Sequence, residues 1–375
     1  MPDQIATVDA ATVAAPLREP IHFGAATIVQ REFALVRVRA QSGAAGYAFT
    51  LTRDGPVAAI VERLIAPRYA GASVDDPAAL FTATQAANLA TFANGVGLRA
   101  LSIVDIAAWD LLGQVRGEPI ERLLGGRPRP LPAAVVVGYP PSLDAAATAV
   151  QVRELRAAGW RRFKLPIAPD VELTRARVAA AAAAAEGDWL GLDAAWSLRR
   201  ADEAATLLDS LDTELGWLED VFPPGNVAAL AELRRRVRTP IAMGDEQGGA
   251  YFPEALLAAA AVDVVRLDLT CAGGISRARD TIAAIERAGA AVSPHMGGQL
   301  HSRVFAGLGC DAPIEWGMPG TGVDPYADSL TQPEIRDGAM EPLPETPGIG
   351  PMTNKAWLSE QRLDDPAGIV ASLPD

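Results

Sequence analysis

The chain has 375 residues, of which 49% are hydrophobic and 21% are charged, and its formal net charge is −13. This length fits two domains or one large barrel with an added domain. The negative charge argues against nucleic acid as a partner, and no apolar run reaches the roughly 18 residues that cross a bilayer. Cys271 and Cys310 provide neither a disulfide framework nor a zinc site, and the first residues lack a signal-peptide pattern. These features predict a reduced, cytoplasmic protein without a nucleic-acid or membrane partner.

Residues 1–130 predict an α+β domain. The segments IATVDAATVAAP, FALVRVRAQSG and YAFTL alternate apolar and polar residues, as antiparallel strands do. The segment GPVAAIVERLIAPRYAG and the stretch from Pro77 to Arg116 are helical in pattern. This domain is expected to precede a second domain of a different architecture.

In residues 131–320, short apolar runs alternate with alanine- and leucine-rich helical stretches. The starts of successive apolar runs are roughly 25 residues apart. Eight strand candidates are AAVVVGY (133–139), RRFKLPI (161–167), WLGLDAA (189–195), LGWLEDV (215–221), PIAMGDE (240–246), VDVVRLDL (262–269), AAVSPHM (290–296) and PIEWG (313–317). The alternation predicts a parallel sheet closed into a TIM-type (β/α) barrel. An open, doubly wound sheet would be favoured by a glycine-rich phosphate loop after the first strand, and GYPPSLD is not one. Residues 321–375 contain PLPETPGIGP and are expected to return to the first domain.

Carboxylates stand at the ends of three consecutive strand candidates. Asp193 ends the third, Glu219 the fourth, and Asp245 with Glu246 the fifth. Because the carboxyl ends of neighbouring parallel strands meet at one rim, these side chains should converge, which is unfavourable unless a cation joins them. All-oxygen ligation suits a hard ion, so the pattern predicts a Mg²⁺ site.

The next strand ends continue the polar series. Asp268 ends the sixth candidate, His295 the seventh and Glu315 lies in the eighth. An aspartate one strand away from a histidine can orient the imidazole and raise its basicity, as a general base requires. Glu315 could give or take a proton on the far side of a ligand. Lys164 and Pro166 on the second strand share a face, so Lys164 is expected to point toward the metal if that face is the lumen.

In order, these motifs resemble the mandelate racemase / muconate lactonizing enzyme group of the enolase superfamily. The resemblance covers nearly the whole chain. The motifs that carry the resemblance are, in chain order, APLREPIHFGAATIVQREFALVRV, ALSIVDIAAWDLLGQVRGEPIERLLGG (100–126), FKLPI, LDAAW, WLEDVFPP, GDEQGG, RLDLTCAGGIS, SPHMGG, IEWG and PETPGIGP. The resemblance implies an enolase-like barrel with an N-terminal capping domain.

The resemblance also implies roles for the residues at the strand ends. Asp193, Glu219 and Asp245 would bind Mg²⁺, with Glu246 as an alternative third ligand. Asp268 and His295 would form the base pair, and Glu315 would be the electrophilic acid. The substrate would be a small-molecule carboxylate.

One departure from the family pattern bears on the reaction. The family's second strand often carries two lysines separated by one residue, and here the second position is Pro166. A racemase needs a base on each face of the carbon, whereas loss of water needs one base and one acid. We therefore expect a lyase that dehydrates a hydroxylated sugar acid to a 2-keto-3-deoxy acid, with Lys164 as a second base or a ligand of the substrate carboxylate. The alternatives are a racemase, epimerase or cycloisomerase on the same site, or a barrel that binds an acid without turnover.

The two other histidines are weaker candidates. His301 lies six residues beyond His295, where it could contact substrate or stabilise the loop, and His22 in the capping segment could reach the pocket mouth. Both are predicted substrate contacts. Apolar helices on a large barrel also predict a homo-oligomer.

Overall fold

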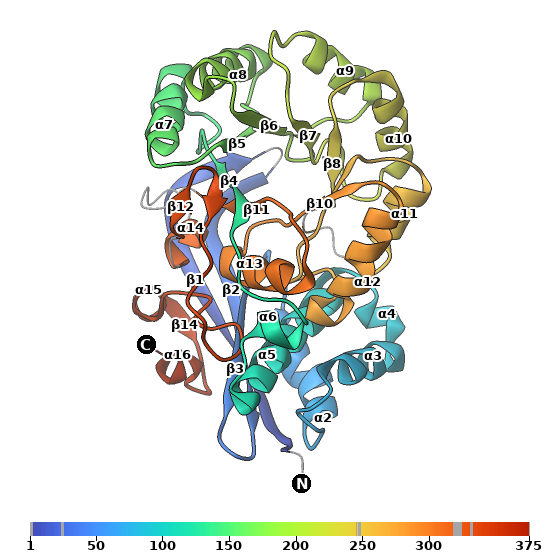
Figure 1. The fold of residues 1–375 in the computed structure, drawn as a ribbon, viewed down its shortest axis with the longest axis vertical. Helices are drawn as coiled ribbons and strands as arrows, with labels where there is room; N and C mark the ends of the chain where they lie inside the picture. The colour runs from blue at the N-terminus through green and yellow to red at the C-terminus, as the bar shows by residue number, and fades with distance from the viewer. Residues whose placement is uncertain are drawn as a thin grey trace.

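The chain has an N-terminal part built on an antiparallel sheet and a second part built on parallel strands, at opposite ends of the molecule (Figure 1). The structure is a computed structural model, and it describes residues 3–23, 26–244, 246, 249–317, 325–330 and 333–374. Asp245, one of the predicted metal ligands, lies outside the described residues.

The N-terminal sheet is a meander of long strands completed by a strand from the end of the chain. Its members are β1 (Ile5–Phe23), β2 (Ala26–Ala40), β3 (Ala45–Leu51) and β14 (Arg362–Asp364), in the order β14-β1-β2-β3. On β1 the side chains of Ala11, Val13 and Ala15 are buried, and the residues between them are partly exposed. The predicted alternation therefore sets one face of the sheet against the helices.

The helices that pack on this sheet follow in one run. They are α1 (Val57–Ile60), a π-helical turn η1 (Val61–Ile65), α2 (Ala66–Tyr69), α3 (Pro77–Ala87), α4 (Leu89–Phe92), α5 (Gly95–Arg116) and α6 (Ile120–Leu123). Asp76 caps α3 by accepting the N–H of Ala79, and Pro77 occupies the first helical position, where its missing N–H costs nothing.

Helix α5 joins three parts of the molecule through two buried carboxylates. Asp110 accepts the N–H groups of Tyr47 on β3 and of Ile349 in the C-terminal segment, at 2.8 and 2.7 Å. Asp105 accepts the N–H of Ser276 at 3.0 Å. Burial raises the pKa of Asp105 to about 7 and that of Asp110 to about 6, against the opposing effect of these hydrogen bonds. The helix thereby fixes the N-terminal part against the strands that follow.

Gly46 on β3 is the point of closest approach between that strand and α5. A Cβ atom there would lie 2.2 Å from the carbonyl oxygen of Ala107 and 2.2 Å from the amide nitrogen of Leu111. We expect Gly46→Ala to destabilise the protein by about 1–3 kcal/mol, because backbone atoms must move apart. Urea unfolding measures this loss. Gly43→Ala is not a suitable control for this contact. The φ of Gly43 is 94°, so an alanine there would add backbone strain of its own.

The second part contains the eight predicted strands. They are β4 (Leu131–Val136), β5 (Arg162–Pro166), β6 (Trp189–Asp193), β7 (Trp217–Glu219), β8 (Ile241–Met243), β9 (Val264–Arg266), β10 (Ala291–Ser293) and β11 (Ile314–Trp316). Every neighbouring pair from β4 to β10 is parallel, and β11 pairs in parallel with β4.

Helices connect these strands and lie around their outer side (Figure 1). They are α7 (Ala145–Ala157), α8 (Val171–Ala185), α9 (Ala201–Asp209), α10 (Val227–Arg236), α11 (Phe252–Ala258), α12 (Gly274–Arg287) and α13 (Gly298–Leu308). The side chains of Asp144, Asp170 and Asn226 cap α7, α8 and α10, respectively, by accepting an N–H from the first turn. The alternation of strand and helix is confirmed.

The sheet departs from a closed, all-parallel barrel. Two short strands, β12 (Ile335–Arg336) and β13 (Ala339–Met340), extend it, and β13 pairs antiparallel with the start of β4. Within the described residues no ladder joins β10 to β11; instead Ser293 Oγ donates to the carbonyl of Pro313 at 3.0 Å. The predicted modified, enolase-like barrel is thus confirmed, in the form of a mixed, curled half-barrel in place of a fully closed cylinder.

The C-terminal segment returns to the N-terminal sheet. It includes α14 (Pro325–Ser329), α15 (Lys355–Ser359) and α16 (Ile369–Ser372), in addition to β14. Strand β14 pairs antiparallel with β1, and Arg37 on β2 donates to Ser372 Oγ at 2.9 Å. The boundaries 1–130, 131–320 and 321–375 stay predictions.

The structure shows the state of the two cysteines and the character of the helices. Cys271 and Cys310 are both buried, and no disulfide joins them. In the part of the chain that the structure describes, no helix combines the length and apolar character needed to cross a membrane.

Candidate active site

The carboxyl ends of the parallel strands bring the predicted acidic residues together. In the strand register, Pro166 on β5 stands opposite Asp193 on β6, and Asp193 stands opposite Glu219 on β7. Lys164 lies two residues before Pro166, so both side chains are on one face, and both line the same cavity. Regular strand spacing thus places two predicted metal ligands side by side.

Lys164 is the centre of a cluster of buried charges. Its Nζ lies 2.9 Å from Glu315 Oε2, 3.0 Å from Glu219 Oε1 and 3.3 Å from Asp193 Oδ2. Burial alone would lower the pKa of Lys164, but the surrounding carboxylates raise it well above its ordinary value. The side chain is therefore an ammonium ion among three carboxylates, which does not favour its use as a second base.

Arg266 on β9 is a second buried cation, and no role was predicted for it from the sequence. Its Nε donates to Glu219 Oε1 at 2.9 Å, and a terminal guanidinium nitrogen pairs with Glu315. Another guanidinium nitrogen donates to Ser293 Oγ and to the carbonyl of Pro294, at 2.7 and 2.8 Å. The sequence does contain a signal for this residue. Arg266 is a charged residue inside the apolar run VVRLDL, two positions before Asp268.

These buried groups leave an excess of negative charge. With all five groups ionised, Lys164 and Arg266 contribute +2, and Asp193, Glu219 and Glu315 contribute −3, so the sum is −1. Burial raises the pKa of Glu219 to about 7, although the two cations act in the opposite direction. The cluster is short of positive charge.

One carboxylate oxygen of the cluster has the surroundings of a cation ligand. Glu219 is fully buried, and its Oε2 makes no hydrogen bond to any residue that the structure describes. A buried carboxylate oxygen without a partner is costly, and a metal ion would satisfy it. The available donors are all carboxylate oxygens, as Mg²⁺ prefers, so the residues present fit this ion.

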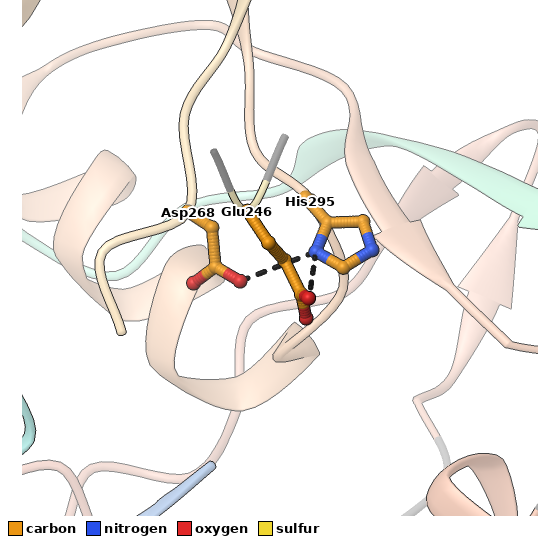
Figure 2. A group of neighbouring side chains, drawn as sticks. All are labelled: Glu246, Asp268 and His295. Atoms are coloured by element: carbon orange, nitrogen blue, oxygen red, sulfur yellow. Dashed lines mark hydrogen bonds and ion pairs between the residues drawn. The ribbon is translucent and has the colours of Figure 1, made fainter. Parts of the chain in front are cut away.

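Asp268 and His295 form the predicted pair, and His295 lines the cavity that Lys164 also lines. His295 Nδ1 lies 3.2 Å from Asp268 Oδ2, and the second ring nitrogen points away from the carboxylate (Figure 2). Asp268 is itself held by Thr270, whose N–H and Oγ1 both donate to Oδ1, at 2.8 and 2.7 Å. Burial on its own would raise the pKa of Asp268, but the hydrogen bond from His295 and the nearby positive groups outweigh it and leave this pKa lowered. An ionised aspartate on Nδ1 holds the imidazole in the orientation that a base needs.

Glu246 joins this pair from a different direction. Its Oε1 lies 3.9 Å from the same nitrogen, His295 Nδ1 (Figure 2). Its Oε2 pairs with Arg53 and lies 3.5 Å from a guanidinium nitrogen of Arg99. Ligand atoms of Glu246, Asp268 and His295 all lie within 4.8 Å of one another. The residue predicted as an alternative metal ligand thus lies beside the histidine as well.

The other two histidines are placed where a substrate role gains no support. His301 on α13 is fully buried; its Nε2 accepts the N–H of Leu269 at 3.1 Å, and its Nδ1 donates to the carbonyl of Met296. Burial lowers the pKa of His301, so the ring is neutral and structural. His22 is exposed on β1, with Nδ1 3.1 Å from Thr27 Oγ1, and it is not among the described residues that line the cavity.

A cavity of about 1140 Å³ lies between the two parts of the molecule. Lys164, Asp193, Glu246, His295 and Glu315 line it from the strand ends, and Arg31, Arg53 and Arg99 line it from the N-terminal part. The charge cluster and His295 thus face one cavity, which can hold a small anionic molecule beside a cationic group and a base.

Both parts of the chain match known family models. Residues 5–125 match the N-terminal domain of mandelate racemase / muconate lactonizing enzyme, and residues 147–356 match the enolase C-terminal domain-like model. The chain belongs to the mandelate racemase / muconate lactonizing enzyme family of the enolase superfamily. The resemblance predicted from the sequence is confirmed.

Relatives in this family differ in the reaction they are named for. The chain is 30% identical over 344 residues to an L-rhamnonate dehydratase from Saccharopolyspora erythraea, covering 85% of this chain and 83% of that protein. It is 29% identical over 364 residues to a D-galactarolactone cycloisomerase from Agrobacterium fabrum, covering 90% and 93%, respectively.

A solved family structure has the same fold. The L-talarate dehydratase of a Polaromonas species, complexed with Mg and L-glucarate, aligns with a TM-score of 0.82 at 22% identity, covering 97% of this chain and 99% of that one. At this identity, the likeness establishes the architecture of the family and not a shared substrate.

Proposed function

We propose that this protein is a Mg²⁺-dependent dehydratase of hydroxylated sugar acids. The observation that carries the proposal is that one base and one cluster of buried charges line a single cavity. His295, which is held by Asp268, and Lys164, which is held by its carboxylates, line the same cavity, whereas position 166, which often carries a lysine in the family, is proline. One base with no partner opposite favours loss of water over inversion at the carbon.

The residues proposed to hold Mg²⁺ are Asp193, Glu219 and Asp245. When bound, the ion would act as a Lewis acid on the substrate carboxylate and stabilise the negative charge that develops there. Lys164 supports the same carboxylate from within the cluster, because its ammonium group is fixed by Glu219 and Glu315 and needs no reorganisation.

His295 removes the proton on the α-carbon in this proposal. Asp268 accepts from Nδ1, so the opposite ring nitrogen takes the proton, and the aspartate stabilises the imidazolium that forms. The proton then goes to the hydroxyl on the β-carbon, which leaves as water and yields a 2-keto-3-deoxy acid after tautomerisation.

Glu315 is the less suitable source of that proton. Its Oε2 lies 2.9 Å from Lys164 Nζ and also pairs with Arg266. Two adjacent cations favour the ionised carboxylate, which cannot donate a proton. His295 can return the proton it has taken, so we assign it both steps and assign Glu315 the role of holding the two cations in place.

A cycloisomerase is the second candidate, because a relative at 29% identity carries that name. It would use the same base and the same cation, and it would also need only one catalytic face. A racemase or epimerase is less favoured, since Pro166 has no titratable group.

A substrate screen tests the proposal. We expect a 2-keto acid to form from at least one acid in a panel of aldonic and aldaric acids, detected as its semicarbazone, with Mg²⁺ but not with EDTA. Readdition of Mg²⁺ should restore the rate. Solvent deuterium at the α-carbon without release of water would favour the isomerase, and neither exchange nor product from any acid would favour a binding protein.

A further inference from the structure

Glu246 is an acidic residue that the proposed mechanism does not use. It lies directly after the proposed ligand Asp245, lines the cavity, and is nearly buried, with 5% of its side chain exposed. Its two oxygen atoms have different surroundings. One faces the base on the strand side, and the other faces two arginines of the N-terminal part.

The first oxygen shares a target with Asp268. Glu246 Oε1 lies 3.9 Å and Asp268 Oδ2 lies 3.2 Å from the same atom, His295 Nδ1 (Figure 2). The second ring nitrogen is directed away from both carboxylates (Figure 2). Two negative charges on the Nδ1 side favour the tautomer with its proton there and stabilise the imidazolium after proton transfer.

The second oxygen is tied to the N-terminal part. Arg53 pairs with Glu246 Oε2 from the turn after β3, and Arg99 approaches it from α5 at 3.5 Å. Arg99 is buried and is fixed in turn by donating to the carbonyl of Leu51 at 2.8 Å. These contacts fix the direction of the Glu246 side chain.

The same contacts argue against a metal ion on Glu246. The close cluster of Glu246, Asp268 and His295 has the composition of a cation site. However, Arg53 and Arg99 hold one oxygen of the Glu246 carboxylate toward the N-terminal part. His295 Nδ1 is engaged by Asp268 and cannot donate its lone pair to a metal while it carries a proton.

From this geometry we infer that Glu246 is a second positioning residue for the base His295, set in place by the contact between the two parts of the molecule. The inference rests on the proposed function, in which His295 removes the α-proton. It predicts that the base is fully aligned only when Arg53 and Arg99 lie over the strand ends. In this inference Glu246 acts through His295 and is neither a metal ligand nor a substrate contact.

The experiment compares Glu246→Gln with the wild-type protein in the Mg²⁺-loaded state, first without substrate. Because the chain has three histidines, ¹⁵N-histidine labelling gives few signals, and His295→Asn identifies the one of interest. We expect Glu246→Gln to shift the His295 Nδ1–H resonance and to speed its exchange with water. Calorimetric titration with Mg²⁺ should give an affinity close to wild type, whereas Asp193→Asn should weaken it.

Turnover of an acid found in the screen gives the second measurement. We expect Glu246→Gln to lower kcat roughly 10- to 100-fold, as loss of an orienting partner does, with little change in KM. Glu246→Asp should recover part of this loss, since it restores the charge. Combined with Asp268→Asn, the effect should be smaller than the product of the two single effects, because both act on one atom.

Glu121→Gln is the matched control. Glu121 is a buried carboxylate paired with Arg303 at 2.9 Å, and it is not among the described residues that line the cavity. Its replacement should leave the His295 signal and kcat unchanged.

Three results would overturn the inference. Loss of Mg²⁺ affinity in Glu246→Gln would make Glu246 a ligand, a rise in KM alone would make it a substrate contact, and an unchanged His295 signal would make it structural. If no acid is turned over, the proposed function fails, while the spectra still decide the role of Glu246.

Discussion

Replacing His295 with asparagine should abolish exchange of the substrate α-proton with solvent deuterium and leave Mg²⁺ binding intact. The imidazole is held by Asp268 at 3.2 Å, and its second nitrogen is the proposed proton acceptor. Asparagine has a similar size but cannot accept a proton near neutral pH. A general base contributes about 10²- to 10⁴-fold to a rate, so kcat should fall by at least the middle of that range. Proton NMR in D₂O measures the exchange directly.

The same variant separates chemistry from folding. Calorimetric titration with Mg²⁺ and the thermal unfolding midpoint should match wild type, because His295 makes no contact with Asp193 or Glu219 among those the structure describes. His22→Asn provides a histidine control, since its ring is exposed and does not line the cavity. Exchange at the wild-type rate in His295→Asn would show that another group removes the proton.

Glu219→Gln should remove most of the affinity for Mg²⁺ while the protein stays folded. The amide keeps an oxygen acceptor for Lys164 and Arg266, which lie 3.0 and 2.9 Å from Oε1. It replaces the unpartnered Oε2 with an uncharged group. Loss of an outer-sphere partner already costs 10- to 100-fold in metal affinity, and loss of a charged ligand should exceed that. Mg²⁺ at 100 times its Kd should stabilise the wild type by about 2.7 kcal/mol and the variant by much less.

Unfolding measured with EDTA and with Mg²⁺ distinguishes the outcomes. Circular dichroism in EDTA should show a folded variant, which separates loss of the ion from loss of the fold. Glu254→Gln on the exposed side of α11 is the control, and it should keep the full Mg²⁺-dependent increase in stability. If Glu219→Gln responds to Mg²⁺ as the wild type does, the ion does not bind at this cluster.

The positions of Asp193 and Glu219 could be predicted because parallel strands repeat at a fixed length. Each strand–helix unit returns the chain to the same rim, so residues at corresponding points become neighbours, and the register confirms that they stand opposite each other. The same rule placed His295 beside Asp268. Regular geometry carries this information without knowledge of side-chain packing.

The parts that were missed depend on side-chain direction or on distant segments. In the sequence, Arg266 is only a charged residue within an apolar strand. The structure shows that its side chain pairs with Glu219 and Glu315. The orientation of Glu246 depends on Arg53 and Arg99, which are far away in the sequence. Likewise, the antiparallel pairing of β13 with β4 involves two residues of each strand, too few to leave a periodic signal.

The pairing of β14 with β1 has a consequence for the order in which the protein assembles. The first and last strands of the chain are neighbours in one sheet. During synthesis on the ribosome, residues 131–320 can begin to fold before β14 has been synthesised, so the outer edge of β1 is still unpaired at that stage. The sheet is therefore complete only after residues 362–364 have been synthesised, and a chain that stopped before them would leave the edge of β1 at Thr12–Ala14 unpaired.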